Sequence, residues 1–400
     1  MIREGKILRI HLQIVLCVIG YSLLYFIMTT LIYFYSMSNG YNGLGLPVFG
    51  GGDDGYFYYE QAVNFINDVP YVFTSIHVWI LGYVLKFFNT DDVIFLRFFN
   101  YFANIALLTI GLLMLKKIIE IPKAYSISAT ILVFLFAFYP SLLLNSTLSI
   151  YRDVWIYTFF LWSMYLFMNI FIKKGKWPRI VSVLLLIFTM SMLGGYRRYA
   201  LLSFMVGSAV YLLLKVFNKR KISVTKFLLI MFVGISIFYQ LFRNFKLPVV
   251  GLSFTDVLNY RQLGLEAGGS QMGISLDQPN IIMFYLNYVY SLISNFIGPL
   301  PWQITGGSTL ILMVTEGFIF ICISIFLLRK YKNFSNSDMY LLIQAFIWFL
   351  LISVSNDNFG TAARLRIVGW LPLIILFVKF YGEHILRKRT NKRKDLQNER

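Results

Sequence analysis

Apolar runs long enough to cross a lipid bilayer recur from one end of this chain to the other. A helix needs about 17–25 predominantly apolar residues to span the hydrocarbon core. The 400-residue sequence is 58% hydrophobic and only 14% charged, whereas soluble domains carry about 25% charged residues. Within hydrocarbon the backbone polar groups must be satisfied internally, which restricts such long runs to helices. The sequence therefore predicts an all-α, polytopic integral membrane helical bundle.

Lysines and arginines stand in short clusters between these runs. Cytoplasmic loops carry an excess of basic residues, so an even number of crossings should separate neighbouring clusters. About ten transmembrane helices satisfy this condition, with both termini in the cytoplasm. The predicted helices are 11–35, 93–115, 124–147, 154–172, 179–195, 199–217, 226–243, 308–328, 338–355 and 366–382.

Two shorter apolar stretches, 75–89 and 281–298, are predicted to be interfacial amphipathic helices in the outer loops. In the first, apolar residues follow helical spacing at Ile76, Trp79, Ile80, Tyr83, Val84 and Phe87. A short true span is the alternative for this stretch. Residues 1–386 are expected to form one transmembrane domain, and 387–400 a basic cytoplasmic tail that is disordered and solvated.

The net charge of +18 does not indicate a nucleic-acid-binding protein, because the basic residues lie between apolar runs rather than along one face. The topology instead gathers the unusual polar residues in the loops on the outer side. Ionisable groups at membrane depth or at helix ends are functional candidates by default.

Two of these candidates, Asp53 and Asp54, follow three glycines in the stretch GGDDGYFYYEQAV. Glycine lets the backbone turn sharply and lets another group approach closely. A carboxylate held this way at the mouth of a membrane cavity has the chemistry of a general base toward a hydroxyl or amine. The alternative is a glycine-rich turn with solvated carboxylates.

Asp153 is the third acidic candidate, at the junction of two apolar runs in NSTLSIYRDVWIY. Its neighbour Arg152 offers an ion pair as a purely structural alternative. A carboxylate favoured by the dipole at a helix N-terminus is another.

Four arginines fall on the outer side, against the positive-inside trend. They are Arg197 and Arg198 in LGGYRRYALL, and Arg364 and Arg366 in GTAARLRIVGW. Guanidinium groups bind phosphate in a bidentate manner, so these cations suit a lipid-linked phosphate or diphosphate. Arg366 could instead snorkel toward the interface and Arg198 could be structural.

Histidine gives a weaker signal. His77 lies in the predicted amphipathic helix, where a lone histidine is more often a satisfied interfacial residue than a ligand. The chain has three histidines without paired spacing, so no metal site is predicted. The sequence requires no cofactor and leaves the need for a divalent metal undecided.

In this order, these residues resemble the GT-C superfamily of polytopic glycosyltransferases, in particular the branch of protein O-mannosyltransferases and the lipid A aminoarabinose transferase. GDDGYFYYEQA, TSIHVWILGYVLKFF and DDVIFLRFFNYFANIALLTIGLLMLKK are similar to its first outer loop, interfacial helix and arginine-bearing helix. YPSLLLNSTLSIYRDVWIYTFF, GGYRRYALL and ARLRIVGWLPLIIL resemble its second acidic element and its later basic elements. The chain differs in having Asp54 where glutamate is usual, and in lacking a Pro-Pro pair and a large outer domain.

The resemblance implies transfer of a sugar from a polyprenyl-phosphate donor to a glycan, lipid or protein acceptor. The reaction would occur on the outer face of the plasma membrane, in cell-envelope glycan or polysaccharide synthesis. The implied site has catalytic Asp53, Asp54 and Asp153, phosphate-binding Arg197, Arg198, Arg364 and Arg366, and cavity-lining Tyr58, His77 and Arg152. Its partners would be the donor, the acceptor and membrane lipids, with no nucleic acid.

Two other functions stay open from the sequence. A Wzy-type polysaccharide polymerase also uses outer-face arginines on a lipid diphosphate. A transporter or flippase would line a permeation path with the same ionisable residues. Many transporters contain two matching halves, and no such duplication is evident in this sequence.

Overall fold

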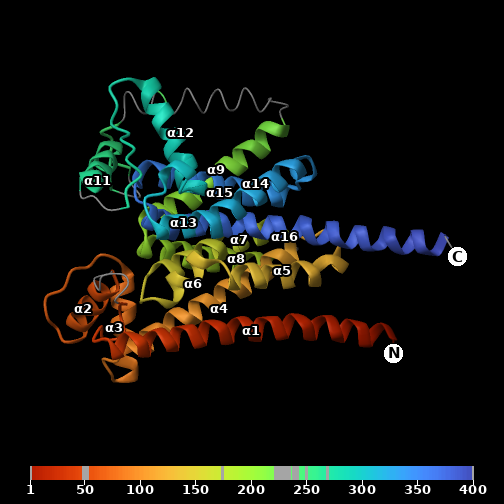
Figure 1. Ribbon diagram of the computed structural model, residues 1–400, viewed down its shortest axis with the longest axis horizontal. Helices are drawn as coiled ribbons and strands as arrows, with labels where there is room; N and C mark the ends of the chain where they lie inside the picture. The colour runs from red at the N-terminus through yellow and green to blue at the C-terminus, as the bar shows by residue number, and fades with distance from the viewer. Residues whose placement is uncertain are drawn as a thin grey trace. The chain divides into compact units, whose positions relative to one another are not determined.

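The structure is a computed structural model that describes residues 2–46, 54–172, 175–219, 236, 243–247, 251–266 and 270–398. Every regular element in these ranges is helical (Figure 1). The longer helices of the first half are α1 (Ile2–Ser38), α2 (Asp54–Ile66), α3 (Ile76–Phe88), α4 (Val93–Ile118), α5 (Tyr125–Ala137), α6 (Pro140–Thr147), α7 (Asp153–Ile172), α8 (Lys176–Tyr196) and α9 (Arg198–Lys219). Those of the second half are α11 (Phe254–Glu266), α12 (Ile281–Ile297), α13 (Gly307–Leu312), α14 (Phe318–Lys330), α15 (Asn336–Ser355) and α16 (Phe359–Asn398).

Eight helices among the described residues are long and apolar enough to cross a membrane, or nine if one bent pair is a single span. The bent pair is α5 and α6, which meet at 59°. Pro140 explains the break, because it has no N–H for the helix ladder and disfavours a helical residue before it. The predicted polytopic helical bundle is confirmed. The predicted helix 226–243 lies outside the described residues apart from its positions 236 and 243.

The chain divides into two compact units. Unit 1 comprises Met1–Arg197, Phe326–Lys332 and Leu371–Arg400, and unit 2 comprises Arg198–Ile325 and Asn333–Trp370. The long helix α16 contributes its first residues to unit 2 and the rest to unit 1. Each unit is described by itself below.

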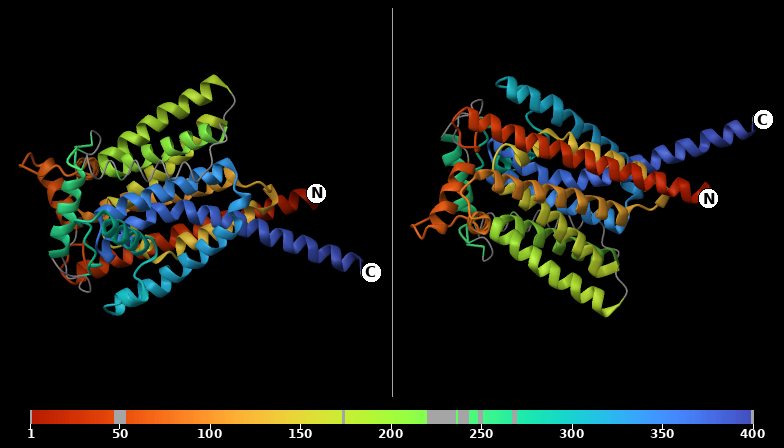
Figure 2. Two further views of the ribbon diagram at one scale, coloured as in Figure 1. Left: turned by 90° about the horizontal axis from the view of Figure 1, so that it is seen from above. Right: turned by 90° about the horizontal axis from the view of Figure 1, so that it is seen from below.

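In unit 1, α4 packs against α7 and α7 packs against α8, while α1 packs along α4 and α5. The short helices α2 and α3 lie at the Ser38 end of α1, and the N-terminus and the C-terminal end of α16 lie at the opposite end (Figures 1 and 2). Lys116 and Lys117 end α4, whereas Asp153 begins α7. Unit 1 therefore has a basic end and an end that carries the acidic candidates.

Helix α3 exposes part of its apolar stripe to the surroundings. Trp79 and Tyr83 are exposed and Phe87 is 82% exposed, whereas His77 and Leu81 are buried. Exposed aromatic residues suit the membrane interface, where an amphipathic ring contacts both headgroups and acyl chains. The predicted spacing of the stripe is present, and the structure adds that the histidine faces the protein.

In unit 2, α12 also exposes apolar side chains, and it buries polar ones. Ser291, Ser294 and Asn295 are buried, while Leu286 and Val289 are exposed. At 17 residues α12 is shorter than the candidate spans. An outward apolar face suits a helix that lies at the membrane interface.

The C-terminal segment differs from its prediction. Residues 387–398 continue α16 as helix through Asn398, whereas the sequence analysis expected a disordered tail. Lysine, arginine and leucine are strong helix formers, and an established helix extends one residue at a time without a new nucleation cost.

Candidate functional site

The centre of the candidate site is an ion pair in unit 1 between Asp153 and Arg197. Arg197 Nη1 lies 3.2 Å from Asp153 Oδ1. Asp153 is the first residue of α7 and Arg197 directly follows α8, so two adjacent helices deliver opposite charges to one point. The Asp153 side chain is 4% exposed and that of Arg197 is 17% exposed. Partial burial strengthens such a pair relative to one in water.

Glycine at 195 permits the close packing at this point. A Cβ atom on Gly195 would lie 2.7 Å from Ile76 Cδ1, closer than real side chains allow. The GGYRRY motif therefore combines a close approach of α3 to α8 with the cation that follows.

Tyr58, on α2, lies among the charged side chains around this ion pair. The Arg152 guanidinium lies 5.6 Å from the centre of the Tyr58 ring. Burial raises the pKa of the Tyr58 phenol to about 12, while the charge of Arg152 opposes that rise. Asp153, Asp54 and Arg197 also act electrostatically on this phenol. The hydroxyl is therefore protonated at neutral pH and lies among four charged side chains.

His77, which lies near Arg152 and Asp153, is held in one protonation state. Its Nε2 lies 2.9 Å from the carbonyl oxygen of Ile150, which only accepts hydrogen bonds, so this contact assigns the proton to Nε2. Burial lowers the pKa of His77 to about 4. The neutral ring leaves Nδ1 as a hydrogen-bond acceptor.

The segment before Asp153 is fixed through its backbone carbonyl groups. Arg97 donates to the carbonyls of Gly43, Thr147 and Leu148 over 2.5, 2.7 and 2.8 Å. Asn100 donates to the carbonyl of Tyr151 over 2.8 Å, and His77 binds that of Ile150. Side chains from α3 and α4 thus hold residues 147–151 and, through them, the start of α7.

The sequence analysis did not assign these positioning roles to Arg97 and Asn100. An arginine inside an apolar run was the available signal, because a buried guanidinium needs partners. What it binds could not be predicted, since two of its three acceptors lie about fifty residues further along the chain.

We expect Arg97→Lys to destabilise the protein. A single ammonium group cannot reach three separated carbonyls in the way that a planar guanidinium does, and each buried carbonyl left without a donor costs about 1–3 kcal/mol. The melting temperature in detergent should fall clearly below that of Arg243→Lys, a change in the half-exposed Arg243–Asp277 pair. Equal melting temperatures for the two variants would contradict the proposed role of Arg97.

The structure thus brings together six of the predicted residues in unit 1: Asp54, Tyr58, His77, Arg152, Asp153 and Arg197. Asp54 is the exposed first residue of α2. Asp53 lies outside the described residues. In unit 2, Arg198 is exposed at the start of α9, and Arg364 is half-buried in α16.

Arg366 has a partner that the sequence analysis did not name. Its guanidinium bonds to the carboxylate of Glu316 and to the carbonyl of Gly298, and it lies 5.4 Å from the Phe320 ring centre. Glu316 sits in a π-helical turn, Met313–Gly317, between α13 and α14. Both side chains are almost fully buried. The Glu316 carboxylate pairs with Arg366 within unit 2, and a phosphate-binding role for Arg366 stays a prediction.

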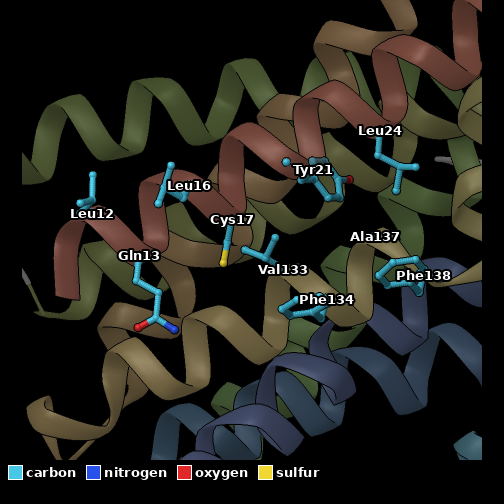
Figure 3. Close-up of a pocket in the computed structure, with 11 residues that line it drawn as sticks. Leu12, Gln13, Leu16, Cys17, Tyr21, Leu24, Val133, Phe134, Ala137 and Phe138 are labelled. Carbon is cyan, nitrogen blue, oxygen red and sulfur yellow. The ribbon is translucent and has the colours of Figure 1, made fainter. Parts of the chain in front are cut away.

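A groove of about 570 Å³ lies between α1 and α5 in unit 1 (Figure 3). Leu12, Leu16 and Leu24 line it from α1, and Val133 and Phe134 from α5. None of the predicted site residues contributes to its lining. Its walls are mostly apolar and offer little hydrogen-bonding chemistry.

Within the described ranges, no group of three or more His, Cys, Asp and Glu side chains is placed to hold a metal ion. The cluster in unit 1 combines two acidic side chains, two guanidiniums, a neutral phenol and a neutral imidazole. Such a set can orient a hydroxyl group, accept its proton and stabilise an anion beside it. Comparisons of the chain with protein-family models, curated proteins and solved structures gave no match.

Proposed function

We propose that the protein is a membrane glycosyltransferase. It transfers a sugar from a polyprenyl-phosphate donor to an acceptor on the outer face of the plasma membrane, in the synthesis of cell-envelope glycan or polysaccharide. The observation that supports this proposal is the convergence of Asp54, Arg152, Asp153 and Arg197 around Tyr58. Charges brought together from distant segments of a membrane protein are costly and mark functional sites.

In the proposed reaction, Asp53 or Asp54 removes the proton from the acceptor hydroxyl or amine. The acceptor attacks the anomeric carbon, the bond from that carbon to the phosphate oxygen breaks, and the polyprenyl phosphate leaves. Asp153 positions the acceptor and is itself fixed by Arg197. Arginines neutralise the charge that develops on the leaving phosphate.

The orientation in the membrane follows from the charges of unit 1. Lys116 and Lys117 at the end of α4, and the basic residues at the end of α16, lie at the end opposite α2 and α3 (Figure 2). Basic residues favour the cytoplasmic side. The proposal therefore places both termini in the cytoplasm and the Asp153–Arg197 pair on the outer side.

We predict that Asp53→Asn or Asp54→Asn abolishes transfer without loss of folded protein. An exposed carboxylate at the start of α2 contributes little to the core, whereas a general base typically contributes about 10²–10⁴-fold to the rate. The measurement is transfer from radiolabelled polyprenyl-phosphate hexose in proteoliposomes. Asp68→Asn is the matched control, because Asp68 is exposed just after α2 and its positive φ of 55° suits asparagine.

Full activity in both the Asp53 and the Asp54 variant would remove the proposed base. Consumption of a lipid diphosphate oligosaccharide in place of the lipid monophosphate sugar would indicate a polymerase of the Wzy type. Movement of the lipid-linked sugar across the bilayer without any transfer would indicate a flippase.

A further inference from the structure

Among the described residues, four buried polar atoms beside the Asp153–Arg197 pair have no hydrogen-bond partner. They are His77 Nδ1, Arg152 Nε, Trp155 Nε1 and Tyr196 Oη. We call these four residues the unpaired cluster. Most buried polar atoms in folded proteins have a partner, because a missing hydrogen bond destabilises the folded state. Four such atoms in one place point to a bound group that supplies the partners.

The four side chains are neighbours, linked through the ring of Tyr58. The Arg152 guanidinium lies 5.6 Å from the Tyr58 ring centre, and the Tyr58 ring lies 5.2 Å from that of His77. The His77 and Tyr196 rings are 5.6 Å apart, and the Tyr196 and Trp155 rings are 6.4 Å apart. The four residues therefore form one continuous cluster.

The hydrogen-bonding roles of the four atoms restrict what that ligand can be. Trp155 Nε1 and Arg152 Nε only donate, and His77 Nδ1 only accepts because Nε2 carries the proton. Tyr196 Oη does both. A phosphodiester or an ionised carboxylate cannot donate to His77, and an ammonium group cannot accept from Trp155. Hydroxyl groups both donate and accept, so a ligand that carries several of them matches the whole set.

The walls of the cluster suit a sugar ring. Trp155 and Tyr196 lie nearly parallel, with 17° between their ring planes, and Phe99 also stacks on Trp155, with the ring centres 4.4 Å apart. Aromatic faces pack against the apolar C–H faces of a sugar while a few polar atoms fix its orientation, as in other ligand sites.

We propose that the unpaired cluster is a subsite for the hydroxyl groups of a neutral sugar ring. The proposal rests on the proposed function for the source of that ring, which is the donor's sugar. In this proposal the Asp153–Arg197 pair beside it contacts the acceptor and the leaving phosphate. His77, Trp155 and Tyr196 then determine which hydroxyl arrangement the protein accepts.

The test uses the full chain in lipid nanodiscs and measures binding of methyl α-glucoside, methyl α-mannoside and methyl α-galactoside by saturation-transfer NMR. We expect at least one glycoside to bind, and Tyr196→Phe to weaken its binding about 3–10-fold, the value of one hydrogen bond. Tyr196→Phe removes only an unpaired hydroxyl, so folding should be retained. Tyr83→Phe, at an exposed tyrosine of α3, is the control.

Two variants of His77 separate ligand binding from support of the fold. In His77→Asn the amide oxygen lies near the position of Nδ1 and the bond to Ile150 is lost. In His77→Gln the amide nitrogen can keep that bond, while the acceptor at Nδ1 is lost. We expect glycoside binding to survive in the asparagine variant and to weaken in the glutamine variant. The reverse order would assign His77 to the fold alone and overturn its part in the subsite.

A second arm measures transfer from undecaprenyl-phosphate hexose by the same variants. Glycoside binding that depends on Tyr196, without any transfer by the wild type, would leave the subsite standing and refute the proposed function. Transfer at unchanged KM in all variants, without glycoside binding, would refute the subsite and assign the four atoms to ordered water.

Discussion

Asp153→Asn is expected to lower the rate of sugar transfer by about 10²–10³-fold, the usual cost of removing one electrostatic partner from an active site. The substitution preserves the size of the side chain and removes its charge. Arg197 then loses the carboxylate that lies 3.2 Å from its guanidinium, and the acceptor loses the group that positions it. Initial rates in proteoliposomes, with donor and acceptor varied separately, measure the effect.

The Arg243–Asp277 pair supplies a matched control. Its nitrogen–oxygen distance of 3.3 Å is close to that of the Asp153 pair, but its side chains are 36% and 60% exposed. Solvent-exposed ion pairs contribute about 0–1 kcal/mol, so Asp277→Asn should leave the rate unchanged. A loss confined to KM for the acceptor would limit Asp153 to binding, and wild-type rates in Asp153→Asn would exclude it from the reaction.

The largest effect on stability is expected from the buried pair in unit 2. Glu316→Gln or Arg366→Met should each destabilise the protein by about 3–5 kcal/mol, because each leaves an uncompensated charge or polar group where the pair is now fully buried. The double variant Glu316→Leu with Arg366→Met removes both charges. We expect it to recover much of the loss, measured as melting temperature in detergent.

A double variant that melts no higher than the single variants would show that Arg366 does more than neutralise Glu316. Its bond to the carbonyl of Gly298 is the second contact that would then account for the cost. A double variant that is stable yet inactive would assign the pair to function.

The helices long enough to cross a membrane could be predicted from the sequence because each is a long apolar run. The bend before Pro140 was not predicted, because 124–147 was interpreted as one helix from its overall apolar content although Pro140 lies within it. For α3 the spacing of apolar residues was evident, but not which face meets lipid. Periodicity defines a stripe, and only tertiary packing decides what it contacts.

The candidate site could be predicted in part. Asp153, Arg197 and Tyr58 lie in one cluster, and their catalytic and binding roles stay predictions. The partner of Asp153 could not be predicted. Arg152 is its neighbour in sequence, but the salt bridge is made by Arg197, 44 positions away. Glu316 was missed for the same reason, because nothing near it in the sequence identifies the arginine that it meets.

The hydrogen bond from His77 to Ile150 links two environments. One face of α3 presents Trp79, Tyr83 and Phe87 to the surroundings, and the other is tied three residues upstream of Asp153. If α3 lies among lipid headgroups, the depth at which its aromatic rings settle also sets the height of the acidic side chain. Bilayer thickness and headgroup composition would then affect the position of the Asp153 carboxylate through α3.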